Sequence, residues 1–140
     1  MRILSIDYGR KRTGIAVTDP LQIIANGLAT VSTSELYEFL LEYVQREEVE
    51  RIVIGKPLKT NGQPSENLAR VEQFVNRWRK NMSGIPIEYY DERFTSVLAH
   101  RTMIDAGLKK TARQDKALVD TISATIILQG YLEARRNRMK

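Results

Sequence analysis

Acidic residues at separated positions of the chain carry side chains that could bind a metal ion. Asp7 directly follows a short apolar run, at the point where a strand is expected to end. Asp91 and Glu92 follow a second apolar segment. Asp120 lies within residues 117–128, an apolar stretch that we expect to form a largely buried helix. Carboxylates that converge at one edge of a sheet repel each other, and Mg²⁺ or Mn²⁺ would relieve this because both ions prefer oxygen ligands.

Metal ions held by carboxylates suit the hydrolysis of a phosphodiester. Two such ions roughly 4 Å apart can activate a water and stabilise the leaving oxygen, with no need for histidine. The chain has no cysteine and a single histidine, His100, which we expect to be structural. This composition excludes disulfides, thiolate zinc sites, iron–sulfur clusters and multi-histidine metal sites. The chemistry must therefore rest on carboxylates, hydroxyls, Lys, Arg and bound ions.

Asp7 and Asp120 each have a structural explanation that the sequence leaves open. Asp7 suits a turn with Gly9. Asp120 follows Lys116 by four residues, which is the spacing of an ion pair along one helical face. The buried setting argues against a purely structural Asp120, because a buried carboxylate is costly unless it is paired or bound to a cation.

Asp91 and Glu92 are adjacent at the end of an expected strand. Side chains alternate along a strand, so the two carboxylates are expected to face opposite ways. One could point to a site while the other faces solvent or pairs with Arg93. The alternative is that both are solvated acids beside a helix N-terminus.

Basic residues outnumber acidic ones, 22 to 17, which gives a formal charge of +5. Several flank the acidic positions, and our candidates for binding the backbone of a nucleic acid are Arg10, Arg12, Lys56 and Lys116. The alternative is that these basic loops mainly provide solubility. Tyr8, adjacent to Asp7, could also contact a substrate.

The elements that must position these residues alternate along the chain. Strands are expected at residues 3–6, 14–18, within 23–31, 52–55 and 85–90, and helices after Ser32, after Ser65, over 95–107 and over 114–135. Ser32 and Glu35 match a capping box. The order β-β-β-α-β-α-β-α-α predicts an α/β fold with a mixed sheet covered by helices.

The length of 140 residues fits one domain, residues 1–140. The longest uncharged stretch, residues 121–132, is too short for a membrane span, and the early acid at position 7 leaves no room for a signal peptide. Together with the lack of cysteine, these features are compatible with a cytoplasmic protein.

Four segments resemble the YqgF family, which is related to RuvC-type Holliday junction resolvases. They are ILSIDYGRKRTGIAVTD, VIGKPLKTNG, YYDERFTS and DKALVDTISATIILQ. The resemblance covers nearly the whole chain and implies a ribonuclease-H-like fold, a five-stranded mixed sheet with helices on both faces. It also implies the family's proposed activity, a cytoplasmic nuclease acting at the 5′ end of pre-16S ribosomal RNA; early members were instead described as junction resolvases.

By the same resemblance, Asp7, Glu92 and Asp120 take the positions of the family's catalytic, metal-binding acids. In the related resolvases a glutamate ends the fourth strand; here Gly55, Lys56 and Pro57 hold that position, so Glu92 must reach the site from the next strand. The expected cofactor is Mg²⁺ or Mn²⁺, and the expected partner is pre-16S rRNA or branched DNA, bound by a monomer or a homodimer.

Two other functions remain open at this stage. Asp7 to Gly9 with Thr13 and Gly14 resembles the first phosphate loop of actin-type and sugar-kinase-type ATPases. Those proteins bind the nucleotide between two such domains, whereas this chain supplies one. The other alternative is a non-catalytic module that binds RNA through its basic surface.

Overall fold

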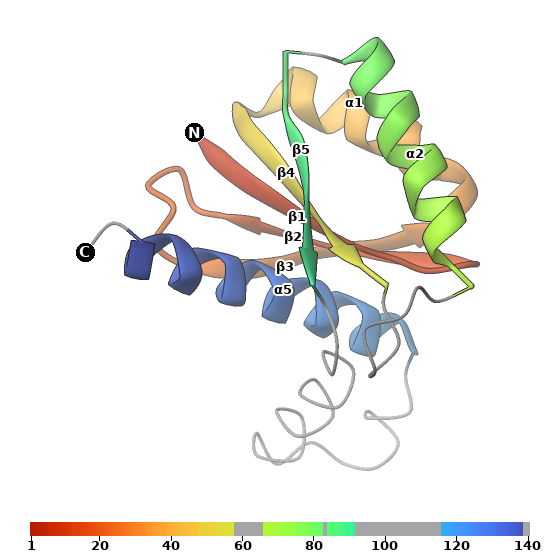
Figure 1. Ribbon diagram of the computed structural model, residues 1–140. Helices are drawn as coiled ribbons and strands as arrows, with labels where there is room; N and C mark the ends of the chain where they lie inside the picture. The colour runs from red at the N-terminus through yellow and green to blue at the C-terminus, as the bar shows by residue number, and fades with distance from the viewer. Residues whose placement is uncertain (58–65, 83, 92–115, 139–140) are drawn as a thin grey trace.

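Five strands form one mixed sheet in the computed structural model, which describes residues 1–57, 66–82, 84–91 and 116–138 (Figure 1). The strands are β1 (Arg2–Tyr8), β2 (Arg12–Thr18), β3 (Ala25–Ser32), β4 (Val49–Lys56) and β5 (Ile87–Asp91). Their order across the sheet is β3-β2-β1-β4-β5. β1, β2 and β3 are antiparallel neighbours, whereas β1, β4 and β5 run parallel. The predicted mixed sheet is confirmed, and the carboxyl ends of β1, β4 and β5 share one edge.

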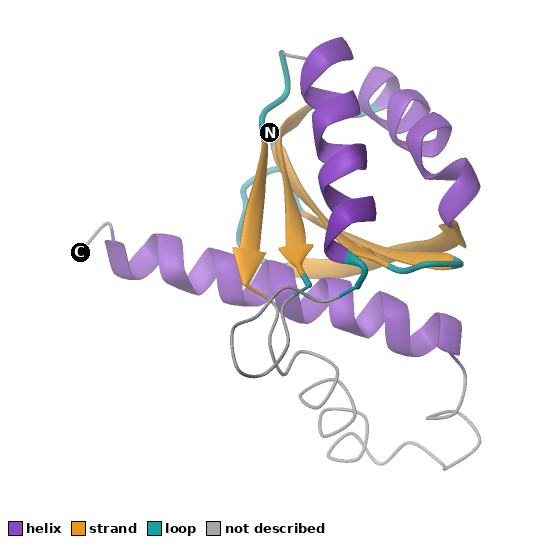
Figure 2. Ribbon diagram, turned by 45° about the vertical axis from the view of Figure 1, so that its right-hand side comes forward, coloured by secondary structure: helices purple, strands orange, loops and turns teal. Residues whose placement is uncertain are grey.

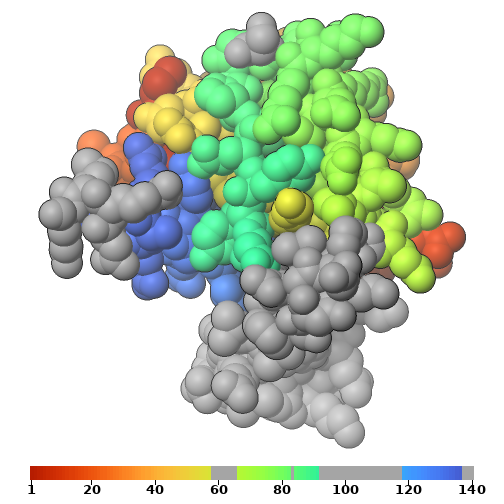
Figure 3. All heavy atoms as spheres, viewed as in Figure 1, coloured from red at the N-terminus to blue at the C-terminus, as the bar shows by residue number. Residues whose placement is uncertain are grey.

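Helices cover both faces of this sheet, as expected (Figure 2). A one-turn 3₁₀ helix, η1 (Thr33–Glu35), leads into α1 (Leu36–Arg46), which lies with α2 (Leu68–Asn81) on one face. α5 (Lys116–Arg138) crosses the other face. β5 lies at the surface between α2 and α5 (Figure 3). None of the described helices is both long and apolar enough to cross a membrane. The helix expected over 95–107 lies outside the described residues.

Strand side chains alternate between two cores, one on each face of the sheet. Leu4 and Ile6 of β1 are buried against α1 and α2, whereas Ile3 is buried against α5. The apolar stripe predicted for α2 is confirmed, because all five of its members are buried: Leu68, Val71, Phe74, Val75 and Trp78. Asp7 and Asp120, two of the three acids singled out from the sequence, lie on the α5 side of the sheet.

The predicted capping box is wrong. Ser32 is still paired with Arg12 in the β-ladder, and its side chain makes no capping hydrogen bond. Thr33 fixes the chain instead, because its hydroxyl donates to the carbonyl oxygen of Gly9 (2.7 Å) and bonds the hydroxyl of Thr13 (2.9 Å). Side-chain bonds to the β1–β2 connection therefore replace the local cap.

The loop between β2 and β3 is organised by Asp19. Its carboxylate accepts hydrogen bonds from the backbone N–H groups of Ile24 (2.7 Å), Ile23 (2.8 Å) and Leu21 (3.0 Å). These bonds, led by that of Ile24, lower the pKa of Asp19 below its ordinary value. The loop presents the side chains of Leu21, Ile23 and Ile24 to solvent.

Candidate active site

Asp7 lies inside β1 rather than after its end, and the alternation of the strand sends its side chain toward α5. Two residues earlier, the hydroxyl of Ser5 donates to the backbone carbonyl oxygen of Ala124 in α5 (2.7 Å). On the opposite face, Tyr8 packs against Phe74 of α2, with ring centroids 5.7 Å apart. Because Ser5 and Asp7 share one face of the strand, Asp7 faces α5.

The side chain of Tyr8 therefore points away from that of Asp7, and its contact with a substrate stays a prediction. Burial raises the pKa of its hydroxyl, which the nearby Arg70 partly offsets. Adjacent residues in a strand point to opposite faces, so closeness in sequence separates these two side chains.

Gly14 of β2 is the direct neighbour of Asp7 in the sheet, and α5 packs onto it. The register pairs Asp7 with Gly14 across the antiparallel ladder. A Cβ on Gly14 would overlap the backbone carbonyl of Asp120 and would lie 3.0 Å from the backbone nitrogen of Thr121. The absence of a side chain at Gly14 thus allows the helix to bring Asp120 against the strand pair that carries Asp7.

The two carboxylates also lie at the same level along β1. α5 runs antiparallel to β1: Ala124 lies over Ser5, and Tyr131 further along the helix bonds Arg51, which pairs with Ile3. From Ser5 to Asp7 the strand advances by about 6.6 Å. From Ala124 back to Asp120 the helix advances by about 6 Å. The fold therefore brings together two acids from opposite ends of the sequence.

Arg12 forms an ion pair with Asp120. Its Nε donates to Oδ2 of Asp120 at 3.1 Å, and the two side chains are 40% and 24% exposed. The structural alternative raised from the sequence named Lys116 as the partner of Asp120; that pair stays a prediction, and the structure shows a pair between Asp120 and Arg12 of β2. In this structure Arg12 thus contacts a carboxylate, although the sequence suggested it for phosphate binding. Nothing is described of the side chain of Lys116.

The other candidate residues fall at different places. Arg10 is exposed in the connection between β1 and β2. Lys56 ends β4, and its Nζ lies 5.8 Å from the ring centroid of Tyr89 on the α1–α2 side. Asp91 ends β5 and pairs in register with Lys56. Glu92 lies outside the described residues, so only Asp7 and Asp120 of the three predicted acids can be compared in space.

Asp91 belongs to the face of β5 that is turned away from α5. The carboxylate of Glu88 lies 3.7 Å from Arg51 on the α5 side, and the ring of Tyr90 packs on Gly130 of α5. Alternation then sends Asp91 to the other face. Of the two adjacent acids Asp91 and Glu92, Asp91 therefore does not face α5.

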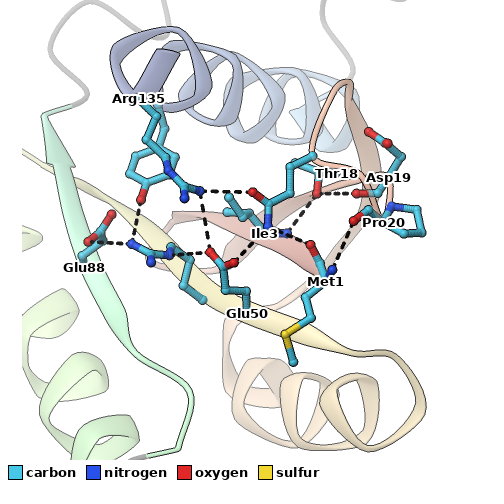
Figure 4. Close-up of polar contacts among 11 residues, drawn as sticks. Met1, Ile3, Thr18, Asp19, Pro20, Glu50, Glu88 and Arg135 are labelled. Carbon is cyan, nitrogen blue, oxygen red and sulfur yellow. Dashed lines mark hydrogen bonds and ion pairs between the residues drawn. The ribbon is translucent and has the colours of Figure 1, made fainter. Parts of the chain in front are cut away.

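A polar network holds the distal half of α5 to the sheet (Figure 4). Glu50 accepts a hydrogen bond from Arg51 (3.0 Å) and lies 3.6 Å from Arg135 of α5. Arg51 also donates to the hydroxyl of Tyr131 (3.1 Å). Burial raises the pKa of Glu50, but hydrogen bonds from Gln22 and Arg51 outweigh it and the net shift is downward. The network fixes the C-terminal half of α5, far from Asp120, and so helps to set the orientation of the helix on the sheet.

The described residues supply two of the three acids expected at a divalent-cation site. Asp7 and Asp120 supply hard oxygen donors, which match Mg²⁺ and Mn²⁺. No group of three or more His, Cys, Asp or Glu side chains suited to a metal ion occurs within the described ranges. A third acidic ligand would have to come from outside those ranges, where Glu92 lies.

Known proteins resemble this chain over nearly its whole length. A family model described as "RuvX: Holliday junction resolvase" matches residues 1–134. A protein of Phocaeicola vulgatus named "Putative pre-16S rRNA nuclease" is 63% identical over 135 residues, which cover 96% of this chain and 97% of the relative. A Parabacteroides distasonis protein of the same name is 56% identical over 138 residues, 99% of each chain.

Solved structures support the fold. The Thermus thermophilus RuvC structure superposes with a TM-score of 0.59 at 17% identity, over 98% of this chain and 97% of that one. The Fowlpox virus resolvase, solved with Holliday junction DNA, gives a TM-score of 0.57 at 14% identity, over 96% and 98% of the chains. The ribonuclease-H-like architecture expected from the sequence is therefore confirmed.

Proposed function

The chain belongs to the RuvX family, and from this premise we propose that it is a metal-dependent nuclease that hydrolyses phosphodiester bonds during 5′-end processing of pre-16S rRNA. The observation that carries the proposal is the position of Asp7 and Asp120 on one face of the sheet and at one level along β1. The names of relatives that share more than half of its residues support RNA as the substrate. Residues 1–140 would act as a single domain in the cytoplasm.

The residues of the chain have separate tasks in this proposal. Asp7 and Asp120 bind the cation, and Glu92 supplies the third carboxylate. When bound there, Mg²⁺ or Mn²⁺ supplies Lewis-acid chemistry: activation of water and stabilisation of negative charge on the leaving oxygen. Arg10, Lys56 and Lys116 bind phosphates of the RNA backbone, Lys56 from the α1–α2 side of the sheet, and their positive charge offsets that of the RNA.

The rigid support of the two acids favours catalysis over simple binding. Asp7 is held within the β1–β2 ladder, and Asp120 is held by helix packing at Gly14. A catalytic site needs its groups fixed in the reactive geometry, because a displacement of about 1 Å can reduce the rate by about 100-fold. An RNA-binding module has no such requirement for its acidic residues.

Cleavage of a pre-16S RNA fragment by the pure protein with Mn²⁺ tests the proposal. The variants Asp7→Asn and Asp120→Asn should each reduce cleavage by about 100-fold or more, because each loses a charged ligand. The matched control is Glu133→Gln, which removes an exposed carboxylate from the distal part of α5 and should cleave as the wild type does. Equal cleavage by wild type and Asp7→Asn would exclude Asp7 as a ligand and indicate a contaminating nuclease.

A Holliday junction resolvase is the second candidate, because the matching family model carries that description. The same preparations should be offered a four-way DNA junction under the same conditions. Faster cleavage of the junction than of the RNA would favour this alternative, provided that Asp7→Asn abolishes it. RNA affinity that ignores divalent ions, with no turnover of either substrate, would instead favour a binding module.

A further inference from the structure

Arg12 is a positively charged residue that contacts Asp120. Arg12 lies on the same face of β2 as Gly14, two residues away. The strand on which α5 packs therefore also carries the guanidinium that contacts Asp120. Its Nε bonds Oδ2 of Asp120 at 3.1 Å, while 40% of its side chain remains open to solvent. The pair is thus neither enclosed nor rigidly shielded from water.

Electrostatics explains why the metal-free site would need such a partner. Two carboxylates on the same face and at about the same level repel each other. A guanidinium carries a positive charge and offers several donors, so it can pair with Asp120 when no metal ion is bound. A cation that binds Asp120 would take over this role and would repel Arg12, which carries the same sign of charge.

We propose that Arg12 is a displaceable counter-ion: it occupies Asp120 in the metal-free protein and transfers to a phosphate of the substrate when a divalent cation binds. This inference rests on the proposed metal-dependent nuclease. Its new content is an exchange that couples the two ligands, since the cation releases the guanidinium that the RNA then uses. Arginine suits the second role because its planar donor fork matches a phosphate group.

The exchange predicts that the variant Arg12→Gln changes the affinities for Mn²⁺ and for RNA in opposite directions. Mn²⁺ no longer has to displace a cationic partner, so it should bind the RNA-free variant about ten-fold more tightly, on the scale of one charge-assisted hydrogen bond. The RNA fragment in the presence of Mn²⁺ should bind the variant about ten-fold more weakly, because a charged phosphate contact is lost. A residue with a merely structural role would not move the two affinities in opposite directions.

The experiment is calorimetric titration of the full chain with Mn²⁺ alone, followed by RNA binding at saturating Mn²⁺. Arg12→Lys is the second variant; it keeps the charge but lacks the fork, so its Mn²⁺ affinity should fall between those of wild type and Arg12→Gln. Arg46→Gln is the matched control, because it also removes one positive charge, from an exposed i,i+4 pair with Glu42 on α1. The control should bind both ligands as wild type does, and thermal unfolding checks that each variant is folded.

The outcomes separate this inference from the proposal on which it rests. Tighter Mn²⁺ binding with weaker RNA binding by Arg12→Gln supports the exchange. If wild type binds Mn²⁺ and Arg12→Gln binds it equally or more weakly, the exchange is refuted while the metal-dependent nuclease stands. If wild type, Arg12→Lys and Arg12→Gln all fail to bind Mn²⁺, both are refuted together.

Discussion

Replacing Gly14 by alanine tests whether the close packing of α5 on β2 sets the position of Asp120. The added Cβ would fall within 3.0 Å of the backbone carbonyl of Asp120 and would lie 3.0 Å from the backbone nitrogen of Thr121. Ordinary contacts of a Cβ begin at 3.4 Å. Both obstacles are backbone atoms of a helix, so no flexible side chain can move aside and α5 or β2 must shift as a unit.

The expected magnitude follows from that shift. The neighbouring strand β3 is packed just as closely against α5, since a Cβ on Gly27 would lie 2.5 Å from the Thr121 methyl group. Overpacking of this kind costs about 1–3 kcal/mol of unfolding free energy. A helix displacement of about 1 Å should reduce the rate of cleavage by about 100-fold, because Asp120 moves relative to Asp7.

Chemical denaturation and RNA cleavage, measured on the same preparations, check both numbers. The matched control is Gly84→Ala, because a Cβ on Gly84 meets no atom within 4 Å. That variant should keep wild-type cleavage and a free energy of unfolding within about 0.5 kcal/mol of wild type. Cleavage has to be compared where both proteins are fully folded, so that lost stability is not counted as lost activity. Wild-type stability and rate in Gly14→Ala would refute the argument that this contact positions the acid.

Three further substitutions test other contacts, each by thermal or denaturant unfolding. Ser5→Ala removes the buried hydroxyl that donates to Ala124 and should cost about 1 kcal/mol; no loss would show that this bond does not fix α5 on β1. Asp19→Ala should lower the melting temperature at neutral pH. Because folding lowers the pKa of Asp19, its contribution is complete above the unfolded pKa of about 3.9 and disappears as the pH falls through the folded value. The two melting temperatures should therefore converge in acid, and a constant gap would contradict the assignment. Trp78→Ala removes a fully buried ring whose indole N–H donates to Ile85 (3.0 Å), and should cost about 3–5 kcal/mol.

The sequence predicted most of the fold because periodicity reports burial directly. The helical stripe of α2 became buried in full, and the apolar runs of β1 and β4 became the centre of the sheet. Element order then restricted the topology. α1 joins β3 to β4 and α2 joins β4 to β5, which favours parallel strands, and β1 runs in the direction of β3 because both are antiparallel to β2.

Local signals failed where tertiary contacts replaced them. Ser32 and Glu35 have the spacing of a capping box, but Ser32 remains in the β3 ladder and Thr33 bonds the β1–β2 connection. Tyr8 adjoins Asp7 in sequence, yet strand alternation turns it to the opposite face. Neither outcome follows from residue types alone, because each depends on which distant element packs against the strand.

The candidate site was predicted only in part for the same reason. Unusual acids in apolar surroundings drew attention to Asp7 and Asp120, whereas their arrangement depends on Gly14, which the sequence presents as one more strand residue. A glycine within a strand that follows a candidate acid is the signal that could have indicated close helix packing. The pairing of Arg12 with Asp120, 108 positions away, could not be read from local spacing.

The division of the two acids between β1 and α5 has a consequence for biosynthesis. The five strands precede α5 in the chain, so a nascent polypeptide can assemble its sheet while the segment that carries Asp120 is still inside the ribosomal exit tunnel. Until that segment emerges, the partly made protein has one of the two carboxylates and cannot complete the pair. A protein proposed to cut a ribosomal precursor would thus remain inert until the segment that carries Asp120 has left the tunnel.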